Sequence, residues 1–339
     1  MMSSSRISRA GRIVFLASLA FVFAMGAAAQ EPVNVRLLGR LPGLYFPVDG
    51  AGHYAYVGWG QIYHSYRSGW LDVVDVSDPT SPVCVGHIAL PDVVERIRVK
   101  DGLAYIAADY KGLLIIDVTN PTSPTLRGSY DTPNYATGLA ISGGLAFIAD
   151  GASLQIIDVT NPTSPTLRGS FATPGGVEDV FVSDGLAFLA HDGLQIVDVA
   201  NPSSPVLRSS WGSGIRYVFV SNGVAYVSAT YGQGTPYAYG MFYSIDVTSP
   251  TAPRLLASYG EDGGAGPVYV SGRFAYLGIG TGLHIFDISN PSSPRLCGYY
   301  YHAGGDLFVK GSLVYAAGGD LLIFQFSGAA AANRWQLYR

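Results

Sequence analysis

Cysteine is scarce in this sequence: Cys84 and Cys297 are the only two among 339 residues. A disulfide framework of the kind that holds many small exported domains together is therefore excluded. The two cysteines fall in repeats that are not neighbours. We therefore expect one core-filling thiol and one surface thiol, with no disulfide and no metal site between them.

Clusters of lysine and arginine are also missing. Without residues 1–29 the chain has 17 basic and 24 acidic residues, a formal charge of −7. Proteins that bind nucleic acids usually carry a basic patch or stripe, so we expect no nucleic-acid partner. An apolar period of 3.6 residues is absent after the N-terminal segment, which predicts an all-β chain.

The sequence also lacks the common metal and catalytic motifs. Its six histidines are dispersed, and it has neither a calcium loop of the form D-x-[DN]-x-[DN]-G, nor a phosphate-binding loop, nor a G-x-S-x-G motif. We therefore expect no metal and no cofactor, and a binding role in preference to an enzyme.

The N-terminal segment has the pattern of a secretory signal peptide. Within residues 1–29, three arginines precede an apolar run at 13–25, and four small residues follow. The apolar run is shorter than the roughly 20 residues that span a bilayer. We expect cleavage after Ala29, export to the periplasm or cell surface, and no stable membrane insertion afterwards. Residues 30–328 then form one domain, and 329–339 a C-terminal tail.

What the sequence has in abundance is a repeat. A motif of the form L-x-I-[VIF]-D-[VI]-x-[ND]-P-x-[SA]-P recurs six times, and successive motif aspartates lie 40 to 48 residues apart. These aspartates are Asp75, Asp117, Asp158, Asp198, Asp246 and Asp287. A period of about 40 residues indicates one supersecondary unit stacked many times.

Each unit has the pattern of four short strands. The unit at 135–174 contains four runs rich in branched or aromatic residues, separated by Gly, Asn, Asp or Pro. Pairs such as Asp101-Gly102 and Asn222-Gly223 suit two-residue hairpins between the first and second strands. The prolines that follow the motif aspartate end the third strand. A four-stranded antiparallel meander repeated around an axis predicts a β-propeller.

The last unit is incomplete. Residues 306–327 supply three strands, with Gln325 in place of the motif aspartate and no fourth strand. Residues 33–40 align with the fourth strand of the other units, so we expect that segment to complete the last blade and remove its open edge. The prediction is seven blades closed in this way, and the alternative is six blades with residues 306 onward as a cap.

The motif resembles the LVIVD repeat of exported bacterial and archaeal proteins. The resemblance extends over nearly the whole chain after residue 29, with departures at Gln325 and at Ser249-Pro250. It implies a β-propeller at the cell envelope, and it implies no defined catalytic residue. The motif aspartates recur in six units just before a turn, so we expect them to tether that turn and to have a structural role.

Two long segments lie where the short units have brief loops between the second and third strands. Residues 59–70 and 231–243 are rich in Tyr and Trp beside Gly and Gln, which is typical of recognition surfaces. Since loops on a rigid scaffold often carry binding residues, we expect a ligand site on that face. Its predicted residues are Trp59, Tyr63, His64, Tyr66, Trp70, Trp211, Tyr231, Tyr237, Tyr239, Tyr243, Tyr300 and His302.

Carboxylates at the start of the innermost strands offer a second candidate site. Glu95, Glu178, Asp179 and Asp306 are all expected at one mouth of the central channel. Two of them could act as acid and base, as in glycoside hydrolysis, or they could pair with Arg96 and Arg216 in a solvated ring.

Three functions follow as hypotheses. The first is an exported, non-catalytic binding module, expected to be a monomer, which recognises a protein, peptide or glycan at the cell envelope through its aromatic loops. The second is a periplasmic or extracellular hydrolase or lyase that uses the channel-mouth carboxylates. The third is a structural repeat protein of the cell surface.

Overall fold

The protein is described by a computed structural model in which residues 34–63, 66–232, 238–279 and 282–328 are placed. The predicted signal peptide and C-terminal tail lie outside these residues. The described part of the chain consists of strands and connections, and it contains no helix that could cross a membrane.

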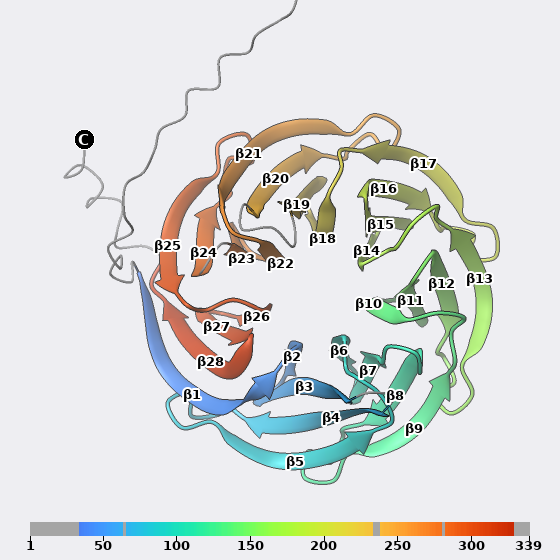
Figure 1. Cartoon of the computed structure of the whole chain (residues 1–339), viewed down its shortest axis with the longest axis vertical. Helices are drawn as coiled ribbons and strands as arrows, with labels where there is room; N and C mark the ends of the chain where they lie inside the picture. Colours follow the sequence, from blue (N-terminus) through green and yellow to red (C-terminus); the bar gives the residue numbers. More distant parts are fainter. Residues whose placement is uncertain (1–33, 64–65, 233–237, 280–281, 329–339) are drawn as a thin grey trace, which may run out of the picture. The chain divides into compact units, whose positions relative to one another are not determined.

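Seven four-stranded antiparallel sheets form a ring around a central channel (Figure 1). The first strand of each sheet lies nearest the channel and the fourth lies outermost. Blade 1 contains β2 (Val48–Ala51), β3 (Tyr54–Tyr63), β4 (Tyr66–Asp75) and β5 (Val83–Leu90). Blade 2 contains β6 (Arg96–Lys100), β7 (Leu103–Ala107), β8 (Leu113–Asp117) and β9 (Thr125–Tyr130). Blade 3 contains β10 (Ala136–Ser142), β11 (Leu145–Asp150), β12 (Ser153–Asp158) and β13 (Thr166–Ala172).

The remaining blades repeat this order. Blade 4 contains β14 (Asp179–Ser183), β15 (Leu186–His191), β16 (Gly193–Asp198) and β17 (Val206–Trp211). Blade 5 contains β18 (Ile215–Ser221), β19 (Val224–Tyr231), β20 (Tyr239–Asp246) and β21 (Arg254–Asp262). Blade 6 contains β22 (Ala265–Ser271), β23 (Phe274–Ile279), β24 (Gly282–Asp287) and β25 (Arg295–Tyr301). Blade 7 contains β26 (Asp306–Lys310), β27 (Leu313–Ala317), β28 (Gly319–Phe326) and β1 (Val35–Tyr45).

The seven-blade prediction is confirmed, and the six-blade alternative is wrong. Strand β1 pairs antiparallel with β28, from Val35 opposite Phe326 to Tyr45 opposite Gly319, so the N-terminal strand completes the last blade. This strand is longer than the predicted residues 33–40. Because β28 is paired with β1 along most of its length, its edge is not left open.

The core is divided into layers between neighbouring blades. One layer packs Leu71 and Val73 of blade 1 against Ile97, Ile106 and Ile116 of blade 2, all fully buried. Burial of a Leu or Ile side chain stabilises a fold by about 1.5–3 kcal/mol. Each blade therefore depends on its neighbours for its buried surface.

Glycines on the outermost strands allow the blades to approach closely. A Cβ atom at Gly128 would collide with the carbonyl oxygen of Pro162 in the turn of the next blade. In blade 4 a serine takes this place, and Ser209 Oγ donates a hydrogen bond of 2.6 Å to the carbonyl of Pro250. The proline turn of one repeat thus rests on the outer strand of the preceding one.

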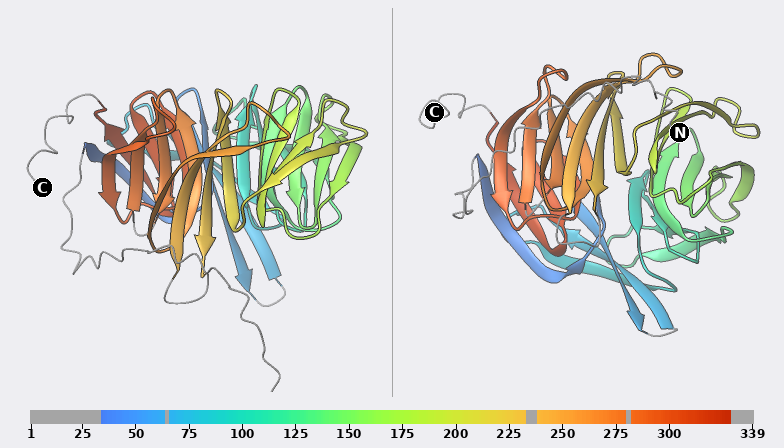
Figure 2. Two further views of the ribbon diagram at one scale, coloured as in Figure 1. Left: turned by 90° about the horizontal axis from the view of Figure 1, so that it is seen from above. Right: turned by 45° about the horizontal axis from the view of Figure 1, so that its top comes forward.

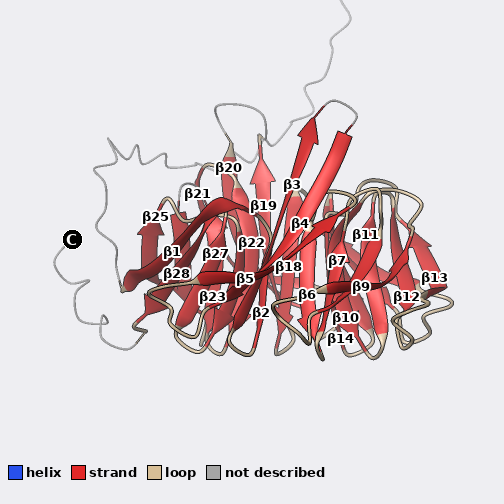
Figure 3. Ribbon diagram, turned by 90° about the horizontal axis from the view of Figure 1, so that it is seen from below, coloured by secondary structure: helices blue, strands red, loops and turns tan. Residues whose placement is uncertain are grey.

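The long segment at residues 59–70 was predicted to be a loop, but the structure shows that most of it is paired strand. Strands β3 and β4 stay paired from Tyr54 opposite Asp75 to Tyr63 opposite Tyr66, and the resulting hairpin projects beyond the ring (Figures 2 and 3). The physical reason is the cross-strand pair Trp59 and Trp70, which stabilises continued pairing once the two strands are in register. The second segment is likewise partly strand, since Tyr239 and Tyr243 belong to β20.

Candidate functional site

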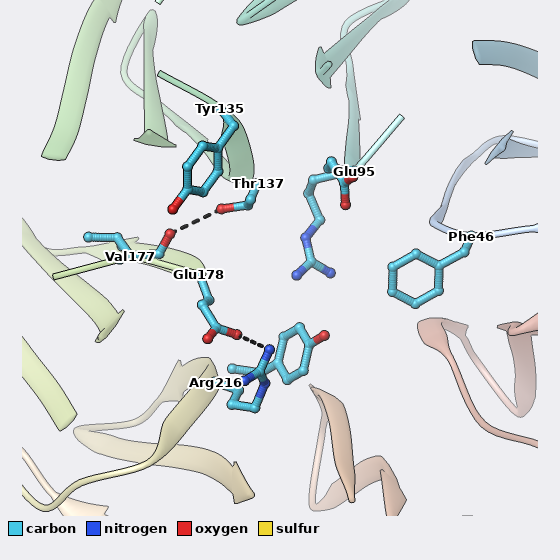
Figure 4. A pocket seen from close by; sticks show the side chains of 10 residues that line it. Phe46, Glu95, Tyr135, Thr137, Val177, Glu178 and Arg216 are labelled. Atoms are coloured by element: carbon cyan, nitrogen blue, oxygen red, sulfur yellow. Dashed lines mark hydrogen bonds and ion pairs between the residues drawn. The ribbon is translucent and has the colours of Figure 1, made fainter. Parts of the chain in front are cut away.

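One face of the ring holds both long hairpins and the mouth of the channel. The innermost strands begin on this face, so residues at their starts converge around the axis. They line a cavity of about 310 Å³ to which five blades contribute. Its lining residues are Phe46, Glu95, Arg96, Tyr135, Thr137, Gly176, Val177, Glu178, Arg216 and Tyr217 (Figure 4).

Arg96 lies beneath the mouth and joins three blades. Its guanidinium donates to Asp306 Oδ1 at 2.9 Å and to Asp179 Oδ1 at 3.3 Å, and the three side chains are 4 %, 4 % and 8 % exposed respectively. The second carboxylate oxygens accept backbone N–H bonds, Asp179 from Val218 and Asp306 from Val48, both at 3.2 Å. This triad is buried and almost fully hydrogen-bonded; only Nε of Arg96 has no partner among the described residues.

Burial and charge oppose each other in the triad. Burial lowers the pKa of Arg96, but the carboxylates of Asp179 and Asp306 more than offset this, so its pKa lies above the ordinary value and the guanidinium stays charged. Burial raises the pKa of Asp179, and Arg96 limits the rise. Two of the four candidate acids, Asp179 and Asp306, are therefore ion-paired to Arg96.

A second ion pair lies in the wall of the cavity itself. Arg216 and Glu178 are 2.6 Å apart and are 29 % and 38 % exposed. Burial raises the pKa of Glu178, although Arg216 opposes the rise. Figure 4 shows this pair across the cavity from Glu95 and Phe46.

The β3–β4 hairpin is fixed to blade 2 by one arginine. Arg67 bonds Asp92 at 3.0 Å and Asp109, and its guanidinium lies 4.7 Å from the ring centroid of Tyr110. Nearer the ring, Trp59 and Trp70 stack with centroids 4.0 Å apart and both are half-buried. Three further predicted residues lie in this hairpin. His64 is outside the described residues, and the side chains of Tyr63 and Tyr66 are not described.

The predicted aromatics of blades 4 and 5 form a second group. Trp211 contacts Tyr243 edge to face at 5.5 Å, and the hydroxyls of Tyr243 and Tyr231 are 3.2 Å apart. Tyr231 and Tyr239 are exposed. Tyr237 lies outside the described residues. Figure 1 shows strands β19 and β20 on the opposite side of the ring from β3 and β4, so the predicted aromatics do not form one patch.

The last two predicted aromatic-site residues lie in blade 6 and after it. Tyr300 is half-buried and packs on Phe324 of blade 7 at 4.6 Å, within the core layer between these blades. His302 is exposed and has a positive φ of 58°. Tyr300 therefore has a packing contact that accounts for it, whereas His302 remains accessible.

The motif aspartates lie on the other face, at the turns. Each accepts a backbone N–H bond from the residue two positions later, for example Asp117 from Thr119 at 3.0 Å and Asp287 from Ser289 at 3.0 Å. The same bond forms at Asp75, Asp158, Asp198 and Asp246. Cys84 and Cys297 are free thiols, and the described residues contain no cluster of three or more metal-binding side chains.

Several residues of the cavity were not predicted as site residues. Phe46, Tyr135 and Tyr217 line it together with Glu95 and Glu178. The signal that could have identified them is positional, since each lies just before or at the start of an innermost strand, as Glu95 and Glu178 do.

The repeat pattern identifies the family. The family model for the LVIVD repeat matches residues 50–89, 93–132, 133–173, 174–212 and 262–301, which make up more than half of the chain. The chain belongs to the LVIVD repeat family. Each matched segment corresponds to one blade, and blades 5 and 7 have no matched segment although they have the same four strands.

Solved structures share the fold of this LVIVD repeat protein. The computationally designed Ika8 protein has a TM-score of 0.59 and 10 % identity, and the match covers 85 % of this chain and 98 % of that one. A functionally unknown protein from Desulfotomaculum acetoxidans DSM 771 has a TM-score of 0.64 and 13 % identity, with 82 % and 93 % covered. A comparison with curated proteins found no match. At these identities the likeness concerns the fold alone.

Proposed function

We propose that the protein is an exported, non-catalytic binding module that recognises a protein, peptide or glycan with the face that carries the channel mouth and both long hairpins. The observation that carries this proposal is the coincidence of a cavity of about 310 Å³ with exposed aromatic side chains on one face. Concave sites with a few polar groups and aromatic walls are the usual form of ligand pockets. Export rests on the sequence pattern of residues 1–29.

The charged groups of the mouth support binding in preference to catalysis. Asp179 and Asp306 are held by Arg96, and Glu178 is held by Arg216. A carboxylate committed to an arginine is poorly placed to exchange a proton with a substrate. Because these pairs join side chains of blades 2, 4, 5 and 7, we expect them to hold the cavity wall in place and so to lower the entropic cost of binding.

The test is a binding screen with a matched pair of variants. The purified protein without residues 1–29 is applied to arrays of glycans, peptidoglycan fragments and peptides. In one variant, Asn-Gly replaces residues 61–68 and Tyr231 and Tyr239 become serine. In the control, the exposed Leu126 and Leu167 of the outer strands become serine. Thermal denaturation checks that both variants fold.

We expect a ligand that the parent and the control bind and the hairpin variant does not. If the hairpin variant binds every ligand as tightly as the parent, the proposed site is wrong.

A hydrolase or lyase is the second candidate, because Glu95 and Glu178 both line the cavity and burial raises the pKa of both. A raised pKa is what a general acid requires near neutral pH. This candidate predicts that Glu95→Gln or Glu178→Gln abolishes turnover of a glycan substrate while the unfolding midpoint is unchanged. Full turnover in both variants would eliminate it.

A further inference from the structure

Glu95 differs from the other charged groups of the cavity because it has no hydrogen-bond or ion-pair partner in the described part of the chain, although the charges of Arg96 and Arg67 lie near enough to lower its pKa. Arg96 is engaged by Asp179 and Asp306, and Arg216 lies 2.6 Å from Glu178. Among the described residues, no group forms a hydrogen bond or ion pair with the Glu95 carboxylate, although it lines the cavity. It is therefore the acceptor that remains available to a ligand.

The mouth also has an excess of negative charge. Five carboxylates, those of Glu95, Glu178, Asp179, Asp306 and Asp49, accompany the guanidinium groups of Arg96, Arg216 and Arg98. Asp109 and Asp92 add negative charge near Glu95, against the single charge of Arg67. A cleft lined by charges of one sign concentrates the field and attracts ligands of the opposite sign.

Aromatic rings supply the remaining walls. Phe46 is half-buried and Tyr135 is exposed, and Figure 4 shows them on opposite sides of the cavity. The face of an aromatic ring attracts a cation; Arg96 already lies 5.5 Å from the ring centroid of Tyr217. A volume of about 310 Å³ is near the lower end of the range for ligand pockets, about 300–1,000 Å³, so the cavity suits a group the size of one side chain.

We propose that the channel mouth binds a cationic group of side-chain size, an ammonium or a guanidinium, which pairs with Glu95 while its apolar stem packs between Phe46 and Tyr135. This inference rests on the proposed binding function and gives the chemistry of the ligand. Anions are disfavoured because Arg96 and Arg216 already pair with carboxylates. A basic side chain of a peptide and a free organic cation share the required chemistry.

Isothermal titration calorimetry with small probes tests this site. The cationic probes are the N-acetyl N-methylamides of lysine and arginine, and n-butylammonium represents a free cation. The corresponding amides of norleucine and glutamate are the neutral and anionic controls. The protein variants are Glu95→Gln and, as a control for the loss of one surface charge on the same face, Asp131→Asn.

We expect the parent to bind at least one cationic probe, Glu95→Gln to weaken that binding tenfold or more, and Asp131→Asn to change it less than twofold. Binding of the lysine or arginine amide indicates a peptide source, and binding of n-butylammonium alone indicates a free cation. Equal affinity for the glutamate amide, or an unchanged affinity in Glu95→Gln, would overturn the inference.

The outcomes also separate this inference from the proposed function. Suppose that an array ligand has no cationic group, that the hairpin variant does not bind it and that Glu95→Gln still binds it. The cation site is then wrong and the binding function stands. If neither the probes nor the arrays give a ligand, both are wrong.

Discussion

The Arg96 triad makes a strong prediction about stability. In Arg96→Met the apolar stem is kept, but the Asp179 and Asp306 carboxylates, 8 % and 4 % exposed, remain buried without their cation. Removing one partner of a buried ion pair typically costs about 3–5 kcal/mol. We expect a loss of that size in the unfolding free energy at neutral pH, measured by urea denaturation with tryptophan fluorescence.

The control is Arg216→Met, which breaks one arginine–carboxylate pair where Arg96→Met breaks two. Because Arg216 and Glu178 are 29 % and 38 % exposed, water can solvate the remaining carboxylate, and the expected loss is about 0–1 kcal/mol. Because one further exposed pair would add no more than about 1 kcal/mol, a larger difference between the two variants measures the effect of burial. A loss in Arg96→Met no larger than in Arg216→Met would refute this account of the triad.

The pH dependence has a definite sign. Burial raises the pKa of Asp179 even with Arg96 present, and loss of Arg96 removes the group that limits this rise. A raised folded-state pKa stabilises the fold below the unfolded value, about 3.9, and this contribution is lost as pH rises through the folded value. The loss of unfolding free energy in Arg96→Met should therefore be largest at neutral pH and should shrink as the pH falls toward about 4.

A neutral version of the triad tests the same reasoning. Adding Asp179→Asn and Asp306→Asn to Arg96→Met removes both buried charges but keeps an oxygen to accept the N–H groups of Val218 and Val48. We expect this triple variant to recover most of the lost stability at neutral pH. No recovery would indicate that the loss in Arg96→Met comes from packing and not from charge.

Two further predictions concern the closure of the ring and the repeated turn. Deleting residues 35–45 exposes the edge of β28, so light scattering after gel filtration should show a higher association state than for a chain that begins at residue 34. Asp287→Ala removes the acceptor of the Ser289 N–H and should cost about 1 kcal/mol in urea denaturation, whereas Asp287→Asn keeps the acceptor and should cost less. Although burial acts to raise the pKa of Asp287, its bonds to Ser289 lower it overall, so this contribution is present above the ordinary pKa of aspartate and is lost as pH falls through the depressed value. If the variant without residues 35–45 has the same association state as the chain that begins at residue 34, the account of ring closure is wrong. If Asp287→Ala and Asp287→Asn lose the same free energy of unfolding, the account of the turn is wrong.

The sequence by itself determined the repeat, the strands and the closure. The period of about 40 residues, the turn pairs such as Asp101-Gly102 and the proline turns are local signals, and the structure has positive φ at both Asp101 and Gly102. The N-terminal strand could be assigned to blade 7 because its pattern matches the outer strand that this blade lacks. Strand pairing within a blade involves neighbours in sequence, so such patterns suffice to predict it.

The site depended on the tertiary structure. Arg96 meets Asp179 and Asp306 from 83 and 210 residues away, and no local pattern indicates which carboxylate faces which arginine across a channel. The segment 59–70 was predicted to be a loop, but pairing of Trp59 with Trp70 extends it into a hairpin. The angular position of each blade decides which strand starts converge on the axis, and this position is set by packing between blades, which is a property of the closed ring.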